Sequence, residues 1–130
     1  MLYLDSSAIV KLFAYEPETA RLVEVIRADP EIVSSVIARV EVVRAVRLRG
    51  TGRDRLERMS EILDRIALVR MDDQIVTRAG ALDPPGLRTL DALHLATALS
   101  LGQDAAAMVT YDARLAEAAA GAGLPVMSPS

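Results

Sequence analysis

The sequence predicts an α/β fold in which helices cover both faces of a parallel sheet. Short, wholly apolar runs alternate along the chain with longer segments of helical periodicity. Strands that are apolar on both faces are typical of parallel sheets buried between helices. The segment LDALHLATALSL, which follows Thr89, is apolar on nearly every face and is expected to form a buried helix. We expect residues 1–130 to form a single domain with its own core.

The expected strands are short, apolar and bounded by turn or capping residues. They are residues 2–4, 32–33, 68–69, 107–110 and 124–127. The expected helices carry apolar residues at helical spacing after a Ser, Thr, Asp or Pro. They start at Ser6 or Ser7, Pro17, Ser34 or Ser35, Asp54, Asp72 or Asp73, Thr89 and Asp112, with breaks at Asp29–Pro30, Gly50 and Asp83–Gly86.

The composition excludes several kinds of chemistry. The chain has no cysteine, which excludes disulfides, zinc–thiolate sites and thiol catalysis and suits the reducing cytoplasm in which we expect it to act. No basic stretch precedes the first apolar run, and no segment is long and apolar enough for a bilayer, so we expect neither signal peptide nor membrane anchor. His94 is the only histidine and no G-x-S-x-G motif occurs, which argues against a serine hydrolase.

Four acidic residues occupy positions where a solvated surface is not expected. Asp5 ends the first strand, Glu41 lies among apolar residues on the helix after the second strand, Asp91 opens the most apolar helix and Asp112 follows the fourth strand. All four belong near the carboxyl ends of the strands, where open parallel sheets bind ligands. Converging carboxylates repel each other unless a hard cation such as Mg²⁺ or Mn²⁺ neutralises them. The pattern therefore indicates metal-assisted chemistry on a phosphate ester.

Each of these positions also has a purely structural explanation. Asp5 and Asp112 could cap the helices that follow them, and Asp91 could complement a helix dipole. His94, three residues after Asp91, could make a hydrogen bond inside its buried helix or support the acidic site. Convergence of all four acidic residues at one edge would favour the functional explanation.

Positive charge is concentrated in one stretch of the chain. Residues 39–58 hold seven arginines and three acidic residues, a net +4, which leaves −7 elsewhere in a chain of net charge −3. The stretch could be a solvated helix face, in which Glu41 pairs with Arg39 or Arg44. It could also be a surface that faces phosphates or a partner.

Four segments together resemble the PIN-domain family and, within it, the VapC toxins. They are LDSSAIVKLF, ARVEVVRA, LDALHLATAL and VTYDARLAEAA, in this order and spread over essentially the whole chain. The resemblance implies a three-layer α/β/α sandwich with a five-stranded parallel sheet in the order 3-2-1-4-5. It also implies a Mg²⁺- or Mn²⁺-dependent endoribonuclease, the toxin of a type II toxin–antitoxin system, with RNA as substrate, a VapB-like antitoxin as partner and a homodimeric state.

The family's acidic site residues fall on the four acidic residues of the predicted site. Asp5, Asp91 and Asp112 would then hold the metal, directly or through water, and Glu41 would help to orient the attacking water. In-line attack would leave a 5′-phosphate and a 3′-hydroxyl.

The resemblance implies two further site residues, and the arginine stretch suggests a third. The family's small polar residues fall on Ser6 and Thr110, and Arg44, one helical turn from Glu41, is expected to guide RNA towards the site. Some relatives carry another Asp where this chain has Arg114, which argues against a second tightly held metal. Two alternatives stay open: a PIN-like RNA- or partner-binding module with weak or no catalysis, and a phosphatase of small phosphate esters.

Overall fold

The computed structural model describes residues 1–29, 31–50 and 52–130. Within these residues, five strands form one all-parallel sheet in the order β3-β2-β1-β4-β5. They are β1 (Leu2–Leu4), β2 (Ile32–Ser35), β3 (Ala67–Val69), β4 (Ala107–Val109) and β5 (Val126–Met127). The predicted fold class and strand order are therefore confirmed.

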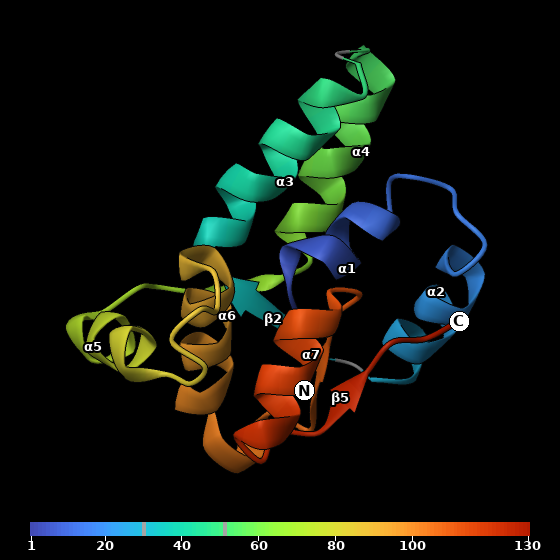
Figure 1. The fold of residues 1–130 in the computed structure, drawn as a ribbon. Helices are drawn as coiled ribbons and strands as arrows, with labels where there is room; N and C mark the ends of the chain where they lie inside the picture. The colour runs from blue at the N-terminus through green and yellow to red at the C-terminus, as the bar shows by residue number, and fades with distance from the viewer. Residues whose placement is uncertain (30, 51) are drawn as a thin grey trace.

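Helices cover both faces of this sheet (Figure 1). They are α1 (Ser6–Lys11), α2 (Thr19–Ala28), α3 (Ile37–Leu48), α4 (Arg53–Asp64), α5 (Asp73–Ala81), α6 (Thr89–Ser100) and α7 (Ala113–Gly121), with a short 3-10 turn at Gly102–Asp104. Side chains alternate between the faces along each strand: Leu2 and Leu4 pack with α1, α3 and α4, whereas Tyr3 packs with α6 and α7. Helix α5 packs on the outside of α6. The result is the predicted three-layer sandwich.

Helix α1 begins at Ser6, one of its predicted starts, and Asp5 caps it through the carboxylate that accepts the Ala8 N–H, as the structural explanation of Asp5 expects. Helix α3 begins later than predicted, at Ile37, and neither Ser34 nor Ser35 is its N-cap. Strand β2 continues through Ser34 and Ser35, where the Ser34 hydroxyl donates to the Leu4 carbonyl of the neighbouring strand at 2.6 Å. Buried serines in a strand give no apolar signal, so the sequence pattern ends this strand too early.

Other boundaries are close to their predicted positions. Helix α2 begins at Thr19, two residues after Pro17, and β5 starts at Val126. The predicted break at Asp29–Pro30 includes Pro30, which lies outside the described residues. Helix α6 is buried over most of its length, as expected for a helix apolar on nearly every face. With 12 residues it is still too short for a bilayer, and no other helix in the described ranges is long and apolar enough.

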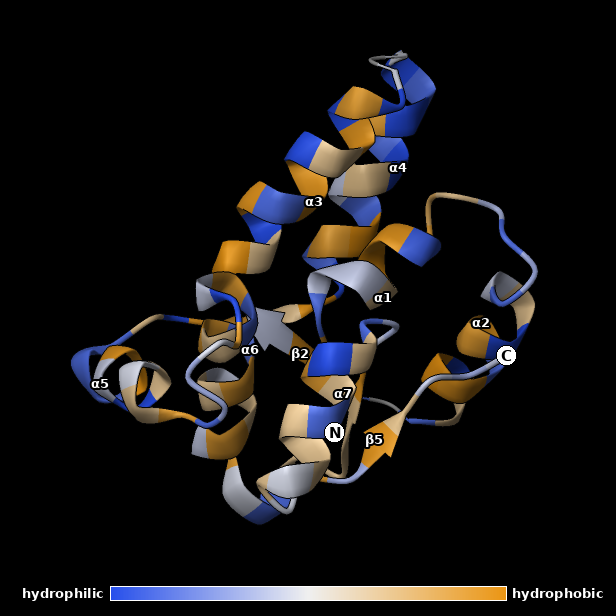
Figure 2. Ribbon diagram, in the orientation of Figure 1, coloured by the Kyte–Doolittle hydropathy of each residue, from blue (hydrophilic) through white to orange (hydrophobic). Residues whose placement is uncertain are grey.

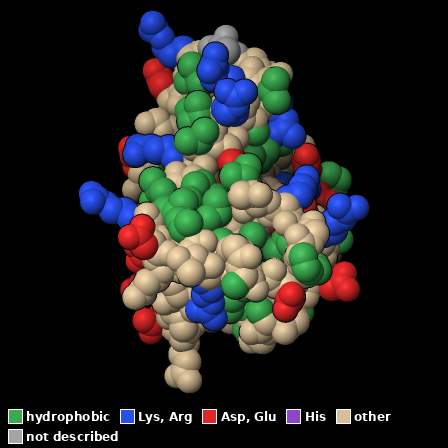
Figure 3. Space-filling view, turned by 60° about the vertical axis from the view of Figure 1, so that its left-hand side comes forward, with side chains coloured by type: hydrophobic (Ala, Val, Ile, Leu, Met, Phe, Trp, Pro, Cys, Tyr) green, Lys and Arg blue, Asp and Glu red, His purple; other side chains and the backbone are tan. Residues whose placement is uncertain are grey.

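Helices α3 and α4 form a hairpin that projects beyond the body of the domain (Figure 1). Hydrophilic residues dominate the outer end of α4 (Figure 2). Lys and Arg side chains surround the tip of the hairpin in the space-filling view (Figure 3). The seven arginines of residues 39–58 are all exposed, so the hairpin presents the positive charge that the sequence concentrates there.

Candidate active site

The candidate site lies where β1 and β4, neighbours in the sheet, reach their carboxyl ends. Asp5 directly follows β1, and Thr110 directly follows β4. The Thr110 hydroxyl donates to Asp5 Oδ2 at 2.5 Å and accepts the Asp112 N–H at 3.1 Å. One threonine therefore links the first and the last of the predicted acidic residues.

Asp5 is a buried carboxylate, with 3% of its surface exposed. Its Oδ1 accepts the Ala8 N–H at 3.0 Å and the Ser7 hydroxyl at 2.6 Å, and its Oδ2 accepts the Thr110 hydroxyl. Burial raises the pKa of Asp5 above its ordinary value, although these three hydrogen bonds act in the opposite direction. A carboxylate in this state gains stability from a nearby cation.

Glu41 lies on α3 and reaches back towards the end of β1. Its Oε1 accepts the Ser6 hydroxyl at 2.6 Å and the His94 Nε2–H at 2.7 Å. Burial alone would raise the pKa of Glu41, but these two hydrogen bonds and the positive charge of Arg88 lower it below its ordinary value. Glu41 is therefore ionised at neutral pH. Its hydrogen-bond partners are Ser6 and His94, and neither Arg39 nor Arg44 forms an ion pair with it in the described ranges.

His94 is 1% exposed and bridges Glu41 to the core. Because an ionised carboxylate only accepts hydrogen bonds, Nε2 must carry a proton. In the neutral ring Nδ1 then accepts from the Tyr3 hydroxyl, 2.7 Å away. Burial raises the pKa of Tyr3, which keeps that hydroxyl protonated and able to donate. Tyr3 and His94 thus hold Glu41 in place from beneath the site. His94 is therefore both a buried, hydrogen-bonded residue of α6 and a support for Glu41.

Asp91 and Asp112 share a single cation, the guanidinium of Arg88. Arg88 Nε lies 3.1 Å from Asp91 Oδ2, and Arg88 Nη2 lies 2.6 Å from Asp112 Oδ2. Asp112 also caps α7, because its Oδ1 accepts the N–H groups of Arg114 and Leu115 at 2.9 and 3.0 Å. Asp112 therefore caps α7 with one carboxylate oxygen and contacts Arg88 with the other.

The structure brings six of the seven predicted site residues into two neighbouring groups. Glu41 contacts Ser6, whereas Thr110 and Arg88 join Asp5, Asp112 and Asp91. Arg44 is exposed on α3, one turn beyond Glu41 towards the tip of the hairpin, and stays outside both groups. Sequence reasoning missed Arg88, whose only signal is its spacing of three residues before Asp91. Within the described ranges, no three His, Asp or Glu side chains lie close enough together to hold one ion. A cation at this edge would therefore need bridging waters or rotated side chains.

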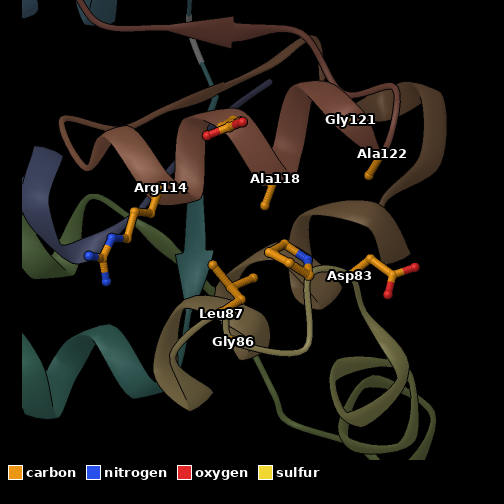
Figure 4. A pocket seen from close by; sticks show the side chains of 9 residues that line it. Asp83, Gly86, Leu87, Arg114, Ala118, Gly121 and Ala122 are labelled. Atoms are coloured by element: carbon orange, nitrogen blue, oxygen red, sulfur yellow. The ribbon is translucent and has the colours of Figure 1, made fainter.

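A cleft adjoins this network between the loop at residues 83–87 and helix α7 (Figure 4). It has a volume of about 700 Å³. Leu87 and Gly86 lie across from Ala118, while Arg114 and Asp83 lie at opposite ends. Leu87 directly precedes Arg88, and Arg114 follows Asp112 by two residues. Both walls of the cleft therefore continue from the acidic site.

Comparisons with known proteins give one consistent result. A family model for the PIN domain matches residues 2–121. The chain is 45% identical over 129 residues to Ribonuclease VapC46 of Mycobacterium tuberculosis, covering 99% of this chain and 98% of that protein. It is 38% identical over 133 residues to Ribonuclease VapC35 of the same species, covering 99% and 97%.

Solved structures share the fold at lower sequence identity. A structure of VapC20 from Mycobacterium tuberculosis, described as a sarcin-ricin loop cleaving toxin, matches with a TM-score of 0.76 at 14% identity, covering 99% of this chain and all of that one. A toxin–antitoxin complex from Klebsiella pneumoniae matches with a TM-score of 0.75 at 21% identity, covering 100% and 98%. These likenesses extend over the whole three-layer fold.

Proposed function

The chain belongs to the PIN-domain family, and from this premise we propose that it is a divalent-metal-dependent endoribonuclease, the toxin of a toxin–antitoxin pair. Relatives named ribonucleases, similar over their whole length, support the activity. One observation carries the proposal: four carboxylates from distant parts of the sequence belong to two hydrogen-bonded groups at one sheet edge, where Asp5 of one group directly precedes Ser6 of the other. We propose that all 130 residues form one such domain.

The residues present suit Mg²⁺ or Mn²⁺. The donors at the edge are carboxylate and hydroxyl oxygens, which hard cations prefer, and Asp5 is a buried carboxylate that lacks a positive partner within hydrogen-bond distance among the described residues. We propose that Asp5, Asp91 and Asp112 hold the cation, partly through water, since Mg²⁺ keeps several waters in its protein sites. When bound, the cation would supply Lewis-acid stabilisation of the charge on the scissile phosphate.

The chain's own residues supply orientation and proton acceptance. Glu41 is ionised and fixed by Ser6 and His94, so it can orient the attacking water and accept a proton from it. Thr110 fixes Asp5 relative to Asp112. Because hydrogen bonds restrict the rotation of Asp5 and Glu41, these two groups need little reorganisation before the reaction.

We propose that single-stranded RNA enters along the cleft beside α7. The apolar contacts of Leu87 and Ala118 suit a nucleobase, and the exposed Arg114 at one end suits a phosphate. The arginines of residues 39–58 project on the α3–α4 hairpin and would attract RNA from a greater distance. This positive charge would offset the repulsion between an acidic site and a polyanion.

We propose a homodimer that binds a VapB-like antitoxin. Apolar side chains are exposed on α3, where Val40 is 61% and Leu48 is 90% accessible. Joined into a contiguous patch, such residues would mark a surface that is covered in an assembly. The proposed place of action is the cytoplasm, where RNA is available.

A paired assay tests the activity. The purified chain is incubated with labelled RNA or with p-nitrophenyl phosphate, in Mn²⁺ or in EDTA. We expect cleavage of RNA in Mn²⁺ only, with little release of nitrophenol. Hydrolysis of the small ester with intact RNA would favour the phosphatase, and RNA binding without cleavage would favour the binding module.

The matched variants are Asp112→Asn and Asp72→Asn. Both residues cap a helix through one carboxylate oxygen, Asp112 on α7 and Asp72 on α5, and asparagine preserves such a cap. Asp112→Asn should abolish RNA cleavage while Asp72→Asn should retain it. Equal activity of the two variants would remove Asp112 from the site.

A further inference from the structure

Arg88 contacts the one carboxylate oxygen of Asp112 that the helix cap leaves available to a ligand. Asp112 Oδ1 is committed to the cap of α7, where two backbone N–H groups donate to it. Oδ2 points to the site and receives Arg88 Nη2 at 2.6 Å. A cation that uses Asp112 would approach this same oxygen, so Arg88 and a metal compete for it.

Arg88 is also free to leave this position. Its side chain is 66% exposed, whereas those of Asp91 and Asp112 are 15% and 22% exposed. Ion pairs of an exposed arginine are weak, because water solvates the separated charges well. Arg88 directly follows Leu87, which lines the cleft, so its exposed side chain starts beside that opening.

We propose that Arg88 binds substrate by exchanging Asp112 for an RNA phosphate, which couples RNA binding to metal binding. A planar guanidinium binds phosphate as readily as carboxylate, through the same paired N–H donors. When RNA binds, one of its phosphates forms an ion pair with Arg88 in place of Asp112, and Asp112 Oδ2 becomes available to the cation. By linkage, the metal then strengthens RNA binding by the same factor. This inference rests on the proposed function, since it assumes both ligands.

Equilibrium binding of Mn²⁺ tests the exchange without measuring activity. Electron paramagnetic resonance measures Mn²⁺ affinity with and without a short RNA at low temperature, and gel electrophoresis verifies that the RNA stays intact during the measurement. Removing two exposed ion pairs in Arg88→Gln should tighten Mn²⁺ binding about 3- to 10-fold without RNA. In the unaltered protein, RNA should raise Mn²⁺ affinity by a similar factor, and in Arg88→Gln it should not.

Two other variants separate the contact from the general effect of charge. Arg78→Gln removes an exposed positive charge on α5 that makes no ion pair with Asp112, so it should keep the coupling. Arg88→Lys keeps the charge but loses the planar fork, so its coupling should be weaker than that of the unaltered protein.

Two results would overturn the inference. One is unchanged Mn²⁺ affinity and unchanged coupling in Arg88→Gln, and the other is an equal loss of coupling in Arg78→Gln. If the unaltered protein cleaves RNA with Mn²⁺ while either result is found, the proposed function stands and Arg88 is only a surface ion pair. If the unaltered protein neither binds Mn²⁺ nor cleaves RNA, the proposed function and this inference fail together.

Discussion

Replacing Asp5 by asparagine should stabilise the protein in EDTA and destabilise it, relative to the unaltered protein, in Mg²⁺. Asparagine keeps the shape of the side chain. Its carbonyl oxygen can accept the Ala8 N–H and the Ser7 hydroxyl, which now donate to Asp5 Oδ1 at 3.0 and 2.6 Å. Its amide can donate to the Thr110 oxygen, which reverses the present hydrogen bond to Oδ2. The substitution therefore removes a charge and preserves the three contacts.

The size of the effect follows from two opposing contributions. A hydrogen bond to a charged group contributes about 1 kcal/mol more to stability than a neutral one. Replacing the three hydrogen bonds of the Asp5 carboxylate by neutral ones therefore lowers the free energy of unfolding by about 3 kcal/mol. An ion at 3% exposure costs several kcal/mol in lost hydration. Because burial raises the pKa of Asp5 in spite of these hydrogen bonds, the cost of burial is larger. We expect a net gain of about 1–2 kcal/mol in the free energy of unfolding, or roughly 3–6 °C in Tm.

Added Mg²⁺ should reverse this order. A ligand at 100 times its Kd stabilises the folded state by about 2.7 kcal/mol, and only the unaltered protein should gain this in full. Thermal unfolding followed by circular dichroism, in EDTA and in a Mg²⁺ series, measures both effects. A variant less stable than the unaltered protein in EDTA would refute the argument from burial. Equal stabilisation of both proteins by Mg²⁺ would refute the placement of the metal at Asp5.

The pH dependence of stability in EDTA gives an independent check. The pKa of Asp5 is higher in the folded protein than its ordinary value of 3.8 in the unfolded chain. Between these two values the folded protein binds a proton that the unfolded chain does not, so the stability contributed by Asp5 falls as the pH rises through this window. Asp5→Asn should lack this fall, and a parallel pH profile of the two proteins would contradict it.

Three other predictions concern RNA binding and the support of the site. Arg44→Ala with Arg47→Ala should weaken RNA binding and reduce the slope of log affinity against log salt by about 1; an unchanged slope and affinity would exclude the hairpin from the RNA path. Tyr3→Phe leaves His94 Nδ1 buried without a donor and should cost about 1–3 kcal/mol in urea unfolding, so a cost below about 0.5 kcal/mol would argue against the assigned tautomer. Gly86 lines the cleft, and a side chain at this position would meet open space, so Gly86→Glu should weaken RNA binding by charge repulsion whereas Gly86→Ala should not; equal affinities of these two variants would place RNA elsewhere.

The sequence predicts the sheet and the edge that holds the acidic residues because both depend on repeated patterns. Short apolar strands alternate with helices, which indicates a parallel sheet, and Asp5 and Asp112, which follow the strands that end at Leu4 and Val109, then belong to the same edge of that sheet. The strand order came from the resemblance to a family, because periodicity alone does not say which strands are neighbours.

The contacts within the site depend on side-chain reach, which the sequence pattern does not contain. Arg88 and Asp112 are 24 residues apart, and only the packing of α6 beside α7 brings them together. His94 is 53 residues from Glu41 in sequence, so its role as that residue's partner could not be inferred from spacing. Asp5 and Asp112 show why choosing between cap and site is misleading, since one carboxylate has two oxygens and can serve both.

The position of a bound Mn²⁺ ion tests the central claim most directly. A crystal of the protein soaked in Mn²⁺ should give one anomalous difference peak at the carboxyl end of β1, within ligand or water-bridged distance of Asp5, Asp91 and Asp112. Asp112→Asn crystals treated in the same way should show a weaker peak or none. A protein that cleaves RNA in Mn²⁺ but carries its ion away from this edge would contradict the claim that these carboxylates hold the catalytic metal.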